Sequence, residues 1–284
     1  MDVLLVTNAF LTGTSFTHLT HALMAASVQQ HVRLVHYTNV QLLANMPDGL
    51  PGQAIFWDKD IRLAQLLEMQ GLRLYNSAQA IADCDDKTLT YLRLLPHNIP
   101  MPETLLCPMT FPGVGYTDFS FVEHAAQRLG LPMVIKEGCG SFGEQVYLAH
   151  TIAEAQDILA RIGAKPALFQ RFVSEAHGQD IRVYVVDGVA IAAIKRSGPA
   201  GNFRSNVAGG GSAAPHTLTA EQQSLALCAC KALGLDFGGV DLLLSKDGPL
   251  VCEVNSNAHF KALQEITGVN PADHILRMVR KAAL

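Results

Sequence analysis

The chain has 284 residues, of which 49% are hydrophobic and 16% charged, and its formal net charge is −4. This composition excludes a disordered chain, and the acidic balance without a Lys/Arg-rich run argues against a nucleic-acid-binding protein. No apolar run is long enough to cross a bilayer, and six scattered cysteines without a CxxC pair favour a reducing, cytoplasmic location.

The first hundred residues alternate strand-like and helix-like segments. Four apolar runs predict the strands Val3–Thr7, Val32–His36, Ala54–Trp57 and Leu72–Tyr75. Helical periodicity predicts Ser15–Gln29 and Ile61–Met69, and two further helices follow the N-cap signals Asn76-Ser77 and Asp85-Asp86. Alternation of this kind predicts a small parallel sheet.

A proline-bearing segment at 99–104 predicts a linker, after which strands are more frequent. The predicted strands are Met133–Lys136, Gln145–Leu148, Ala167–Phe172, Ile181–Val186 and Val189–Ile194. The predicted helices are Phe119–Leu129, Ile152–Arg161, Ala220–Leu233 and Ala272–Ala283. A polar, Gly-rich loop is expected at Ser197–Ser212.

The segment Gly238–Asn257 reads as a β-hairpin with a three-residue turn at Lys246-Asp247-Gly248. That turn places Asp241 directly opposite Glu253, with Asn255 on the face of Glu253. Two facing carboxylates repel unless a cation lies between them, and two carboxylates with an amide oxygen suit magnesium. The alternative is a solvated face with incidental acids.

Three further segments carry groups that suit a nucleotide. In one of them, MVIKEGCGSFGEQVYL, Lys136 lies at a strand end before a glycine-rich loop. Such a loop can close over phosphates, or the segment can be an ordinary hairpin. After the strand that ends at Gln170-Arg171-Phe172-Val173, Glu175 could hold ribose hydroxyls. Arg182 could hold a phosphate or carboxylate, or form an exposed salt bridge with Asp180. The loop with Lys195, Arg196, Arg204 and Asn206 suggests either a site for anionic substrates or a mobile surface loop.

The ordered series Asp86-Lys87, VIK at Lys136, the Gly-rich loop, GQDIRV, GNFRSN, GGVD and LVCEVN resembles the ATP-grasp superfamily, most closely its RimK-like amino-acid ligases. The resemblance covers about two-thirds of the chain and implies an α/β (α+β) fold. It implies a pre-ATP-grasp domain at 1–98, a central subdomain at 99–174 and a C-terminal subdomain with the metal site at 175–284. The implied cofactors are ATP and Mg²⁺, which Mn²⁺ could replace.

The resemblance also implies residue roles. The ATP contacts would come from Lys87, Lys136, Ser141, Gly143, Gln170, Arg171, Phe172, Val173, Glu175, Asp180 and Asn206. The arginines near the phosphate and the acyl substrate would be Arg182, Arg196 and Arg204. The magnesium ligands would be Asp241, Glu253 and Asn255.

Two departures from the family pattern concern specificity. The segment Gln170–Val173, which matches the adenine hinge of the family, has Arg171 where relatives usually carry an acid. The Asn-x-Ser-Pro-Gly sequence that commonly follows the last metal ligand's strand is replaced by Asn255-Ser256-Asn257-Ala258-His259. His259 is expected to be a surface histidine, with acceptor binding or base catalysis as alternatives.

The implied reaction is ATP-dependent ligation of a carboxylate, such as an amino acid, to an amine on a protein, peptide or small molecule, by a cytoplasmic homo-oligomer. The alternatives are a D-Ala–D-Ala or glutathione-type peptide ligase, a non-catalytic ATP-binding regulator, and a dinucleotide-dependent oxidoreductase. The last lacks the GxGxxG motif after Val3–Thr7.

Overall fold

The computed structural model describes residues 1–140, 143–199, 201–205 and 210–282. It contains one parallel and two antiparallel sheets, so the predicted mixed α/β class is confirmed. None of the described helices combines the length and the apolar character that crossing a membrane requires.

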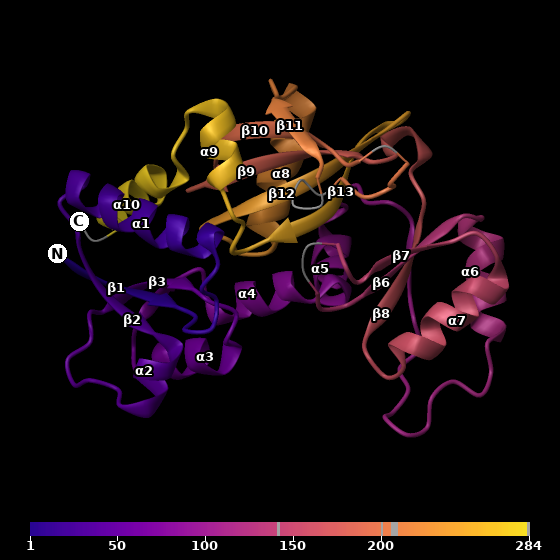
Figure 1. The fold of residues 1–284 in the computed structure, drawn as a ribbon, viewed down its shortest axis with the longest axis horizontal. Helices are drawn as coiled ribbons and strands as arrows, with labels where there is room; N and C mark the ends of the chain where they lie inside the picture. The colour runs from indigo at the N-terminus through magenta and orange to yellow at the C-terminus, as the bar shows by residue number, and fades with distance from the viewer. Residues whose placement is uncertain (141–142, 200, 206–209, 283–284) are drawn as a thin grey trace.

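The N-terminal sheet has four parallel strands in the order β2-β1-β3-β4 (Figure 1). They are β1 (Asp2–Thr7), β2 (Arg33–Thr38), β3 (Gln53–Trp57) and β4 (Arg73–Tyr75). The helices of this region are α1 (Thr14–Gln29), α2 (Asn39–Ala44), α3 (Ile61–Met69) and α4 (Ala78–Asp85). The buried residues of these strands are mostly apolar because helices cover both faces of the sheet, whereas Arg33 and Arg73 at strand ends are exposed.

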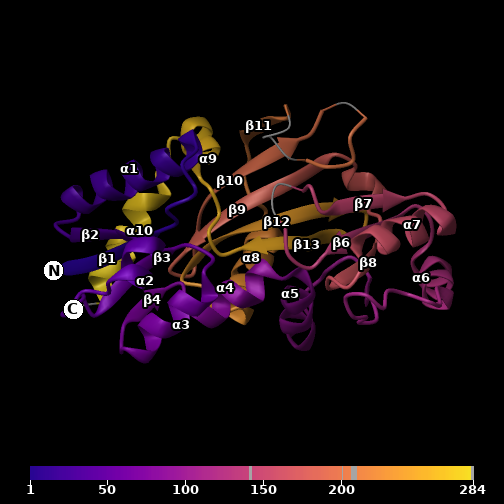
Figure 2. The same ribbon diagram turned by 60° about the horizontal axis from the view of Figure 1, so that its bottom comes forward.

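The central region places two helices on one face of an antiparallel sheet with the order β5-β8-β6-β7. The strands are β5 (Thr104–Leu106), β6 (Met133–Glu137), β7 (Val146–Ala149) and β8 (Ala167–Arg171). The helices are α5 (Lys87–Leu94), a 3₁₀ turn at Leu95–His97, α6 (Ser120–Leu129) and α7 (Ile152–Ile162). Helices α6 and α7 pack on one face of the sheet, α5 contacts β8, and the other face of the sheet is turned toward the C-terminal sheet (Figure 2).

The C-terminal sheet has five antiparallel strands in the order β11-β10-β9-β12-β13. The strands are β9 (Gln179–Val186), β10 (Val189–Ser197), β11 (Ser212–Pro215), β12 (Phe237–Ser245) and β13 (Gly248–Asn255). A 3₁₀ turn (Ser174–Ala176) precedes them, and the helices are α8 (Ala220–Ala232), α9 (Lys261–Thr267) and α10 (Pro271–Ala282).

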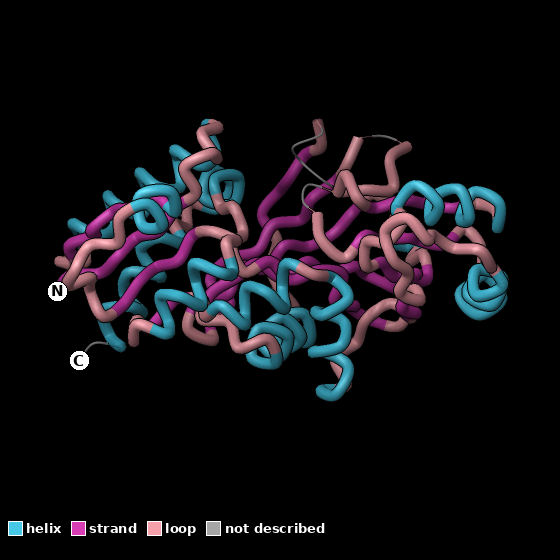
Figure 3. Tube along the Cα trace, turned by 90° about the horizontal axis from the view of Figure 1, so that it is seen from below, coloured by secondary structure: helices cyan, strands magenta, loops and turns pink. Residues whose placement is uncertain are grey.

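One hydrophobic core joins the two ends of the chain. Leu5 and Leu23 of the N-terminal region share a buried cluster with Tyr184, Phe237 and Ile275. Helix α10 lies beside α1, so both chain ends are found on the same side of the molecule (Figure 3). The N-terminal sheet is therefore held against the C-terminal sheet by buried apolar contacts.

Four elements lie outside the predictions, namely α2, β5, β11 and α9. Each has seven residues or fewer; β5 begins at the last residue of the predicted linker, and β11 begins at the last residue of the predicted loop. The sequence of β11, Ser-Ala-Ala-Pro, has no strand preference of its own. Its pairing with β10 makes it a strand, which local sequence does not reveal.

Candidate active site

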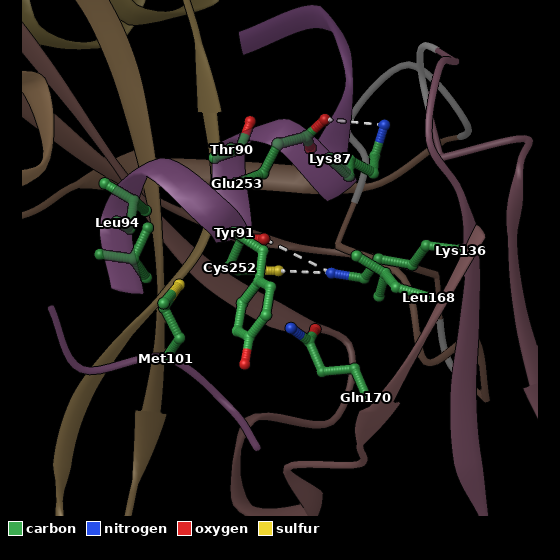
Figure 4. A pocket seen from close by; sticks show the side chains of 11 residues that line it. Lys87, Thr90, Tyr91, Leu94, Met101, Lys136, Leu168, Gln170, Cys252 and Glu253 are labelled. Carbon is green, nitrogen blue, oxygen red and sulfur yellow. Dashed lines mark hydrogen bonds and ion pairs between the residues drawn. The ribbon is translucent and has the colours of Figure 1, made fainter. Parts of the chain in front are cut away.

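A cavity lies between the central and C-terminal sheets, and its space together with the open solvent at its mouth is about 770 Å³. The sequence-predicted residues that line it are Lys87, Lys136, Gly143, Gln170, Arg171, Phe172, Val173, Asp180, Arg196, Arg204, Asp241 and Glu253. A smaller hollow of about 370 Å³ adjoins it beneath Lys87 and Lys136 (Figure 4).

The predicted opposition of Asp241 and Glu253 across the hairpin is confirmed. The predicted turn is wrong by one residue, because Ser245 pairs with Gly248 and leaves only Lys246 and Asp247 in the turn. A bulge between the pairs Asp241–Glu253 and Leu242–Val251 shifts the register back by one.

Four charged residues on adjacent strands form what we call the charge block: Asp180, Arg182, Arg196 and Asp241. The Arg182 side chain donates to both carboxylate oxygens of Asp241, at 2.7 and 2.6 Å. Arg196 donates to both oxygens of Asp180, at 2.6 and 2.5 Å, and also lies 2.8 Å from Asp241 Oδ2. The alternative of an exposed Asp180–Arg182 salt bridge is therefore wrong. Asp180 pairs with Arg196 and Arg182 with Asp241, each on a neighbouring strand, and Asp180 and Asp241 are buried.

Burial and neighbouring charge act oppositely within this block. Burial alone raises the pKa of Asp241, but the guanidinium groups of Arg182 and Arg196 outweigh it and hold that pKa below its usual value. Burial, reinforced by the Asp241 charge, raises the pKa of Asp180 despite Arg196. Burial would lower the pKa of Arg196, but Asp241 and Asp180 raise it, so this arginine stays charged.

Two lysines, which we call the lysine pair, lie at the same cavity. Lys87 is the first residue of α5, whose N-cap is Asp86, and its ammonium group lies 3.4 Å from Glu253 and 3.3 Å from the Gly140 carbonyl. The Lys136 ammonium group on β6 lies 3.4 Å from the Cys252 carbonyl and 3.5 Å from its sulfur. Figure 4 shows both ammonium groups directed at β13. These contacts are long for hydrogen bonds to a cation, so a stronger acceptor can replace them.

The segment Gln170–Val173 forms the wall at one end of the cavity. Buried Gln170 donates to Thr104 Oγ1 at 3.0 Å, and Phe172 contacts the ring of Phe203. The side chain of Arg171 turns away to pair with Glu103 at 2.5 Å. Glu175 lies exposed in the 3₁₀ turn just beyond and is not part of the lining.

Arg204 bridges the two halves of the cavity. Its guanidinium group donates to the Val146 carbonyl on β7, with one of the two distances at 3.1 Å. The neighbouring Ser205 donates to Asp180 Oδ2, so the loop after β10 is held against both the central sheet and the charge block. Two predicted nucleotide contacts, Ser141 and Asn206, lie outside the described residues.

Asp241, Glu253 and Asn255 are the residues that would hold a magnesium ion. The three supply only oxygen ligands, as a hard cation prefers, although no cluster of three or more Asp, Glu, His or Cys side chains occurs in the described ranges. Of the roughly four lone-pair positions of a carboxylate, Asp241 uses three on arginines, which leaves one on Oδ1. Buried Nδ2 of Asn255 has no hydrogen-bond partner among the described residues, so no contact through Nδ2 fixes the orientation of the amide whose Oδ1 would ligate the ion. The set fits magnesium.

The charge of the lining favours an anionic ligand. Among the described lining residues, and leaving out Arg171, whose side chain turns away, the cations Lys87, Lys136, Arg196 and Arg204 outnumber the acids Asp180, Asp241 and Glu253 by four to three. A nucleotide triphosphate that binds a divalent cation keeps a net negative charge, which this excess would offset.

Two supporting residues had no predicted role. Cys252 accepts a contact from Lys136, and Thr104 fixes Gln170. Neither has a sequence signal, because each acts only through the strand that lies beside it.

A family model described as the RimK-like ATP-grasp domain matches residues 84–279. The chain is 37% identical to "N-acetylaspartylglutamate synthase A" of Homo sapiens over 233 residues, 80% of this chain and 58% of that protein. It is 35% identical to "Beta-citrylglutamate synthase B" of Homo sapiens over 219 residues, 76% of this chain and 55% of that protein. The chain thus spans little more than half the length of these relatives.

A bacterial relative and two solved structures add to these matches. "Probable alpha-L-glutamate ligase 1" of Shewanella frigidimarina is 37% identical over 216 residues, 75% of this chain and 69% of that protein. The RimK domain protein from Sphaerobacter thermophilus has a TM-score of 0.74 at 22% identity, over 98% of this chain and 99% of that one. D-alanine–D-alanine ligase from Bacillus anthracis, complexed with ATP, has a TM-score of 0.75 at 17% identity, over 99% and 96%. The two structures share the fold.

Proposed function

We propose that this chain, which belongs to the RimK-like ATP-grasp family, is an ATP- and magnesium-dependent carboxylate–amine ligase. The observation that carries the proposal is one cavity lined by the lysine pair, by Glu253 and by the members of the charge block other than Arg182, with an excess of cations among the described side chains. An oxidoreductase or a structural protein has no use for that arrangement.

The adenine would lie against Gln170–Val173 and the phosphates near the lysine pair. Phosphate oxygens are stronger acceptors than the carbonyl and sulfur that now contact these lysines, so the ammonium groups would transfer to them. Arg171 faces Glu103, so we expect the hinge to contact adenine through its backbone. Glu175, beyond the hinge, is proposed to accept from the ribose hydroxyls.

Asp241, Glu253 and Asn255 are proposed to hold magnesium, or manganese in its place, which when bound offsets charge on the transferring phosphoryl group. The carboxylate substrate would take the γ-phosphoryl group and become an acyl-phosphate. Arg182 and Arg196 are held in place by Asp241 and Asp180, so their positions are fixed before the substrate arrives. Arg204, at the cavity wall, would close the site against water.

The relatives' names point to glutamate as one substrate, because each of the three contains that word. We propose that one member of the amide product is L-glutamate. We also propose that the protein is cytoplasmic and works as a homo-oligomer, which its molar mass in solution would test. Its proposed lobes are 1–98, 99–174 and 175–284, and limited proteolysis would test these boundaries. Its described cysteines are all unpaired.

The test is ADP release with ATP and magnesium, L-glutamate, and each of N-acetyl-L-aspartate, citrate or a glutamate-ended peptide as second substrate. At least one pair should give stoichiometric ADP, phosphate and amide. Glu253→Gln should abolish ADP formation without unfolding the protein, because Glu253 is partly exposed and its ion pair among the described residues is the long one to Lys87, at 3.4 Å. ATP binding with no turnover on any pair would favour a regulator and contradict the proposal.

A further inference from the structure

The sequence departs from the family pattern in two places, and the side chains found there are engaged elsewhere. His259 is half-buried and meets Phe16 of α1 edge to face, at 4.5 Å between ring centroids, so the expectation of a surface histidine is wrong. Arg171 of the hinge turns to Glu103 at 2.5 Å. Gln170, beside Arg171, is the remaining polar side chain of the hinge, and it lines both the cavity and the adjoining hollow.

Gln170 lies on the face of the central sheet that is opposite α6 and α7 and turned toward the C-terminal sheet. It pairs with Thr104 of β5 on one side and with Val134 of β6 on the other, and Val134 also lines the cavity. Because side chains alternate along a strand, Lys136 lies on the same face as Val134, about 7 Å further along β6. An apolar contact for a ring and a cation for phosphates therefore stand next to Gln170.

Two hydrogen bonds in series fix the orientation of the Gln170 amide. The hydroxyl of buried Thr104 donates to the Pro102 carbonyl at 2.7 Å, which uses the one hydrogen of that hydroxyl. Thr104 Oγ1 can then only accept, and it accepts from Gln170 Nε2 at 3.0 Å. The amide nitrogen of Gln170 therefore faces Thr104, and the amide oxygen points away from it.

The position of Thr104 beside Gln170 is itself held by the backbone. Arg171 N donates to the Glu103 carbonyl at 2.8 Å, on one side of Thr104. On the other side, Cys107 N donates to the Ala167 carbonyl at 3.0 Å. A shift of Thr104 along β8 would break these bonds, so the amide of Gln170 is oriented before a ligand arrives.

The oxygen of this amide is an acceptor available to a ligand. Among the described residues, the one hydrogen bond of the Gln170 amide is that of Nε2 to Thr104, so Oε1 has no donor there. Figure 4 shows the amide end of Gln170 directed into the hollow lined by Tyr91 and Lys136. Gln170 is 7% exposed, and an acceptor in such a place costs free energy unless a donor reaches it. A ligand with an N–H group at this position is therefore favoured.

We propose that Thr104 orients Gln170 so that Gln170 Oε1 accepts from the 6-amino group of adenine and rejects the 6-oxo group of guanine, an inference that rests on the proposed ligase function. Adenine carries an N–H donor at that position, whereas guanine carries a carbonyl oxygen, which would meet Oε1 as a second acceptor. Turning the amide to offer Nε2 to guanine would place Oε1 against Thr104 Oγ1, whose hydrogen is held by Pro102. Thr104 is thus a positioning residue, and Gln170 is the group that touches the base.

The experiment measures by calorimetry the binding of ADP, GDP and purine riboside 5′-diphosphate, which lacks the 6-amino group. Magnesium is present and the second substrates are absent, so binding is read without turnover. Thr104→Val removes the hydroxyl, Thr104→Ser keeps it, and Gln170→Met removes the acceptor at similar length. Thr151→Val, which removes the N-cap of α7 in the same lobe, is the control for a loss of stability.

The wild type should bind GDP about 100-fold and the purine analogue about 5-fold more weakly than ADP. Thr104→Val should reduce the difference between ADP and GDP by about 10-fold, because the amide is then free to turn. Thr104→Ser should restore the wild-type selectivity, and Thr151→Val should keep it. In Gln170→Met, ADP and the purine analogue should bind equally.

An unchanged ratio of ADP to GDP affinity in Thr104→Val would overturn the positioning role. A difference between ADP and the purine analogue that persists in Gln170→Met would overturn the contact with the 6-amino group, and this variant leaves Thr104 intact if Thr104→Val does not fold. Equal affinity of the wild type for ADP and GDP would also overturn the inference. If the expected selectivities are found but no substrate pair gives turnover, the base assignment holds and only the ligase function is wrong.

Discussion

The charge block and the lysine pair lie at one cavity but are held differently. In the charge block, both side chains of the Asp180–Arg196 pair are less than a tenth exposed and joined by two short hydrogen bonds. Among the described residues, the ammonium groups of the lysine pair make contacts of 3.3–3.5 Å, to carbonyls, a sulfur and Glu253. The first is complete without a ligand, whereas the second is ready to exchange its partners. A site for a triphosphate needs both, because one part fixes geometry and the other binds the changing charge.

Asp241→Asn should have the largest effect, because it acts on both fold and chemistry. It leaves Arg182 and Arg196 facing a neutral amide in a buried place and should destabilise the protein by about 3–5 kcal/mol. ADP formation should fall below detection even at temperatures where the variant is folded. Denaturant unfolding and ADP release are the measurements, with Asp247→Asn, exposed in the turn of the same hairpin, as the control. An unchanged unfolding midpoint would mean that the charge block is not a buried unit.

Lys136→Met should separate binding from stability. Among the described residues, the ammonium group contacts Cys252 at 3.4 and 3.5 Å, which is long for a hydrogen bond, so the free energy of unfolding should change by less than about 1 kcal/mol. The KM for ATP should rise by about 10-fold or more, since a charge-assisted phosphate contact is lost. ATP-dependent kinetics and unfolding curves are measured together, with exposed Lys246→Met as a comparison. A large loss of stability at unchanged KM would reverse the roles of the two regions.

Acid titration of stability should distinguish the two acids of the charge block. The folded pKa of Asp241 is lowered, so its stabilisation is present above the unfolded pKa of about 3.9 and is lost as pH falls through the folded value. The folded pKa of Asp180 is raised, so its contribution is lost as pH rises from that value through the folded one. The free energy of unfolding, measured at several pH values, should therefore fall less steeply in Asp241→Asn as pH decreases. In Asp180→Asn it should fall less steeply as pH increases above about 3.9. Identical profiles in both variants would contradict the opposite shifts.

Arg171→Ala should have the smallest effect. Arg171 pairs with Glu103 at the surface, and such pairs contribute about 0–1 kcal/mol. Nucleotide affinity, measured by calorimetry, should stay near the wild-type value because the side chain turns away from the cavity. A clear loss of affinity would show that the hinge contacts the nucleotide through this side chain.

Most helices and strands were predictable because they depend on local periodicity and caps. Asp86 caps α5 and Thr151 caps α7, as their residue types suggest. The Asp241–Glu253 pairing was also predictable, although two errors cancelled: the turn is one residue shorter, and a bulge restores the register. The short strands β5 and β11 were not, since their pairing with β8 and β10 makes them strands, and α2 was missed although Thr38 and Gln41 form a local capping box.

By itself, the sequence determined the order of the motifs, the hairpin that carries Asp241 and Glu253, and the family. Only the tertiary structure decided which charges meet. The strand order β10-β9-β12 sets Arg196 beside Asp180 and Arg182 beside Asp241, so that opposite charges alternate across three strands. It also brought His259 against Phe16, 243 positions earlier in the chain. The reason is that strand order and the packing of the lobes bring charged residues into contact. Both depend on burying apolar side chains from the whole chain, not on the sequence next to each charged residue.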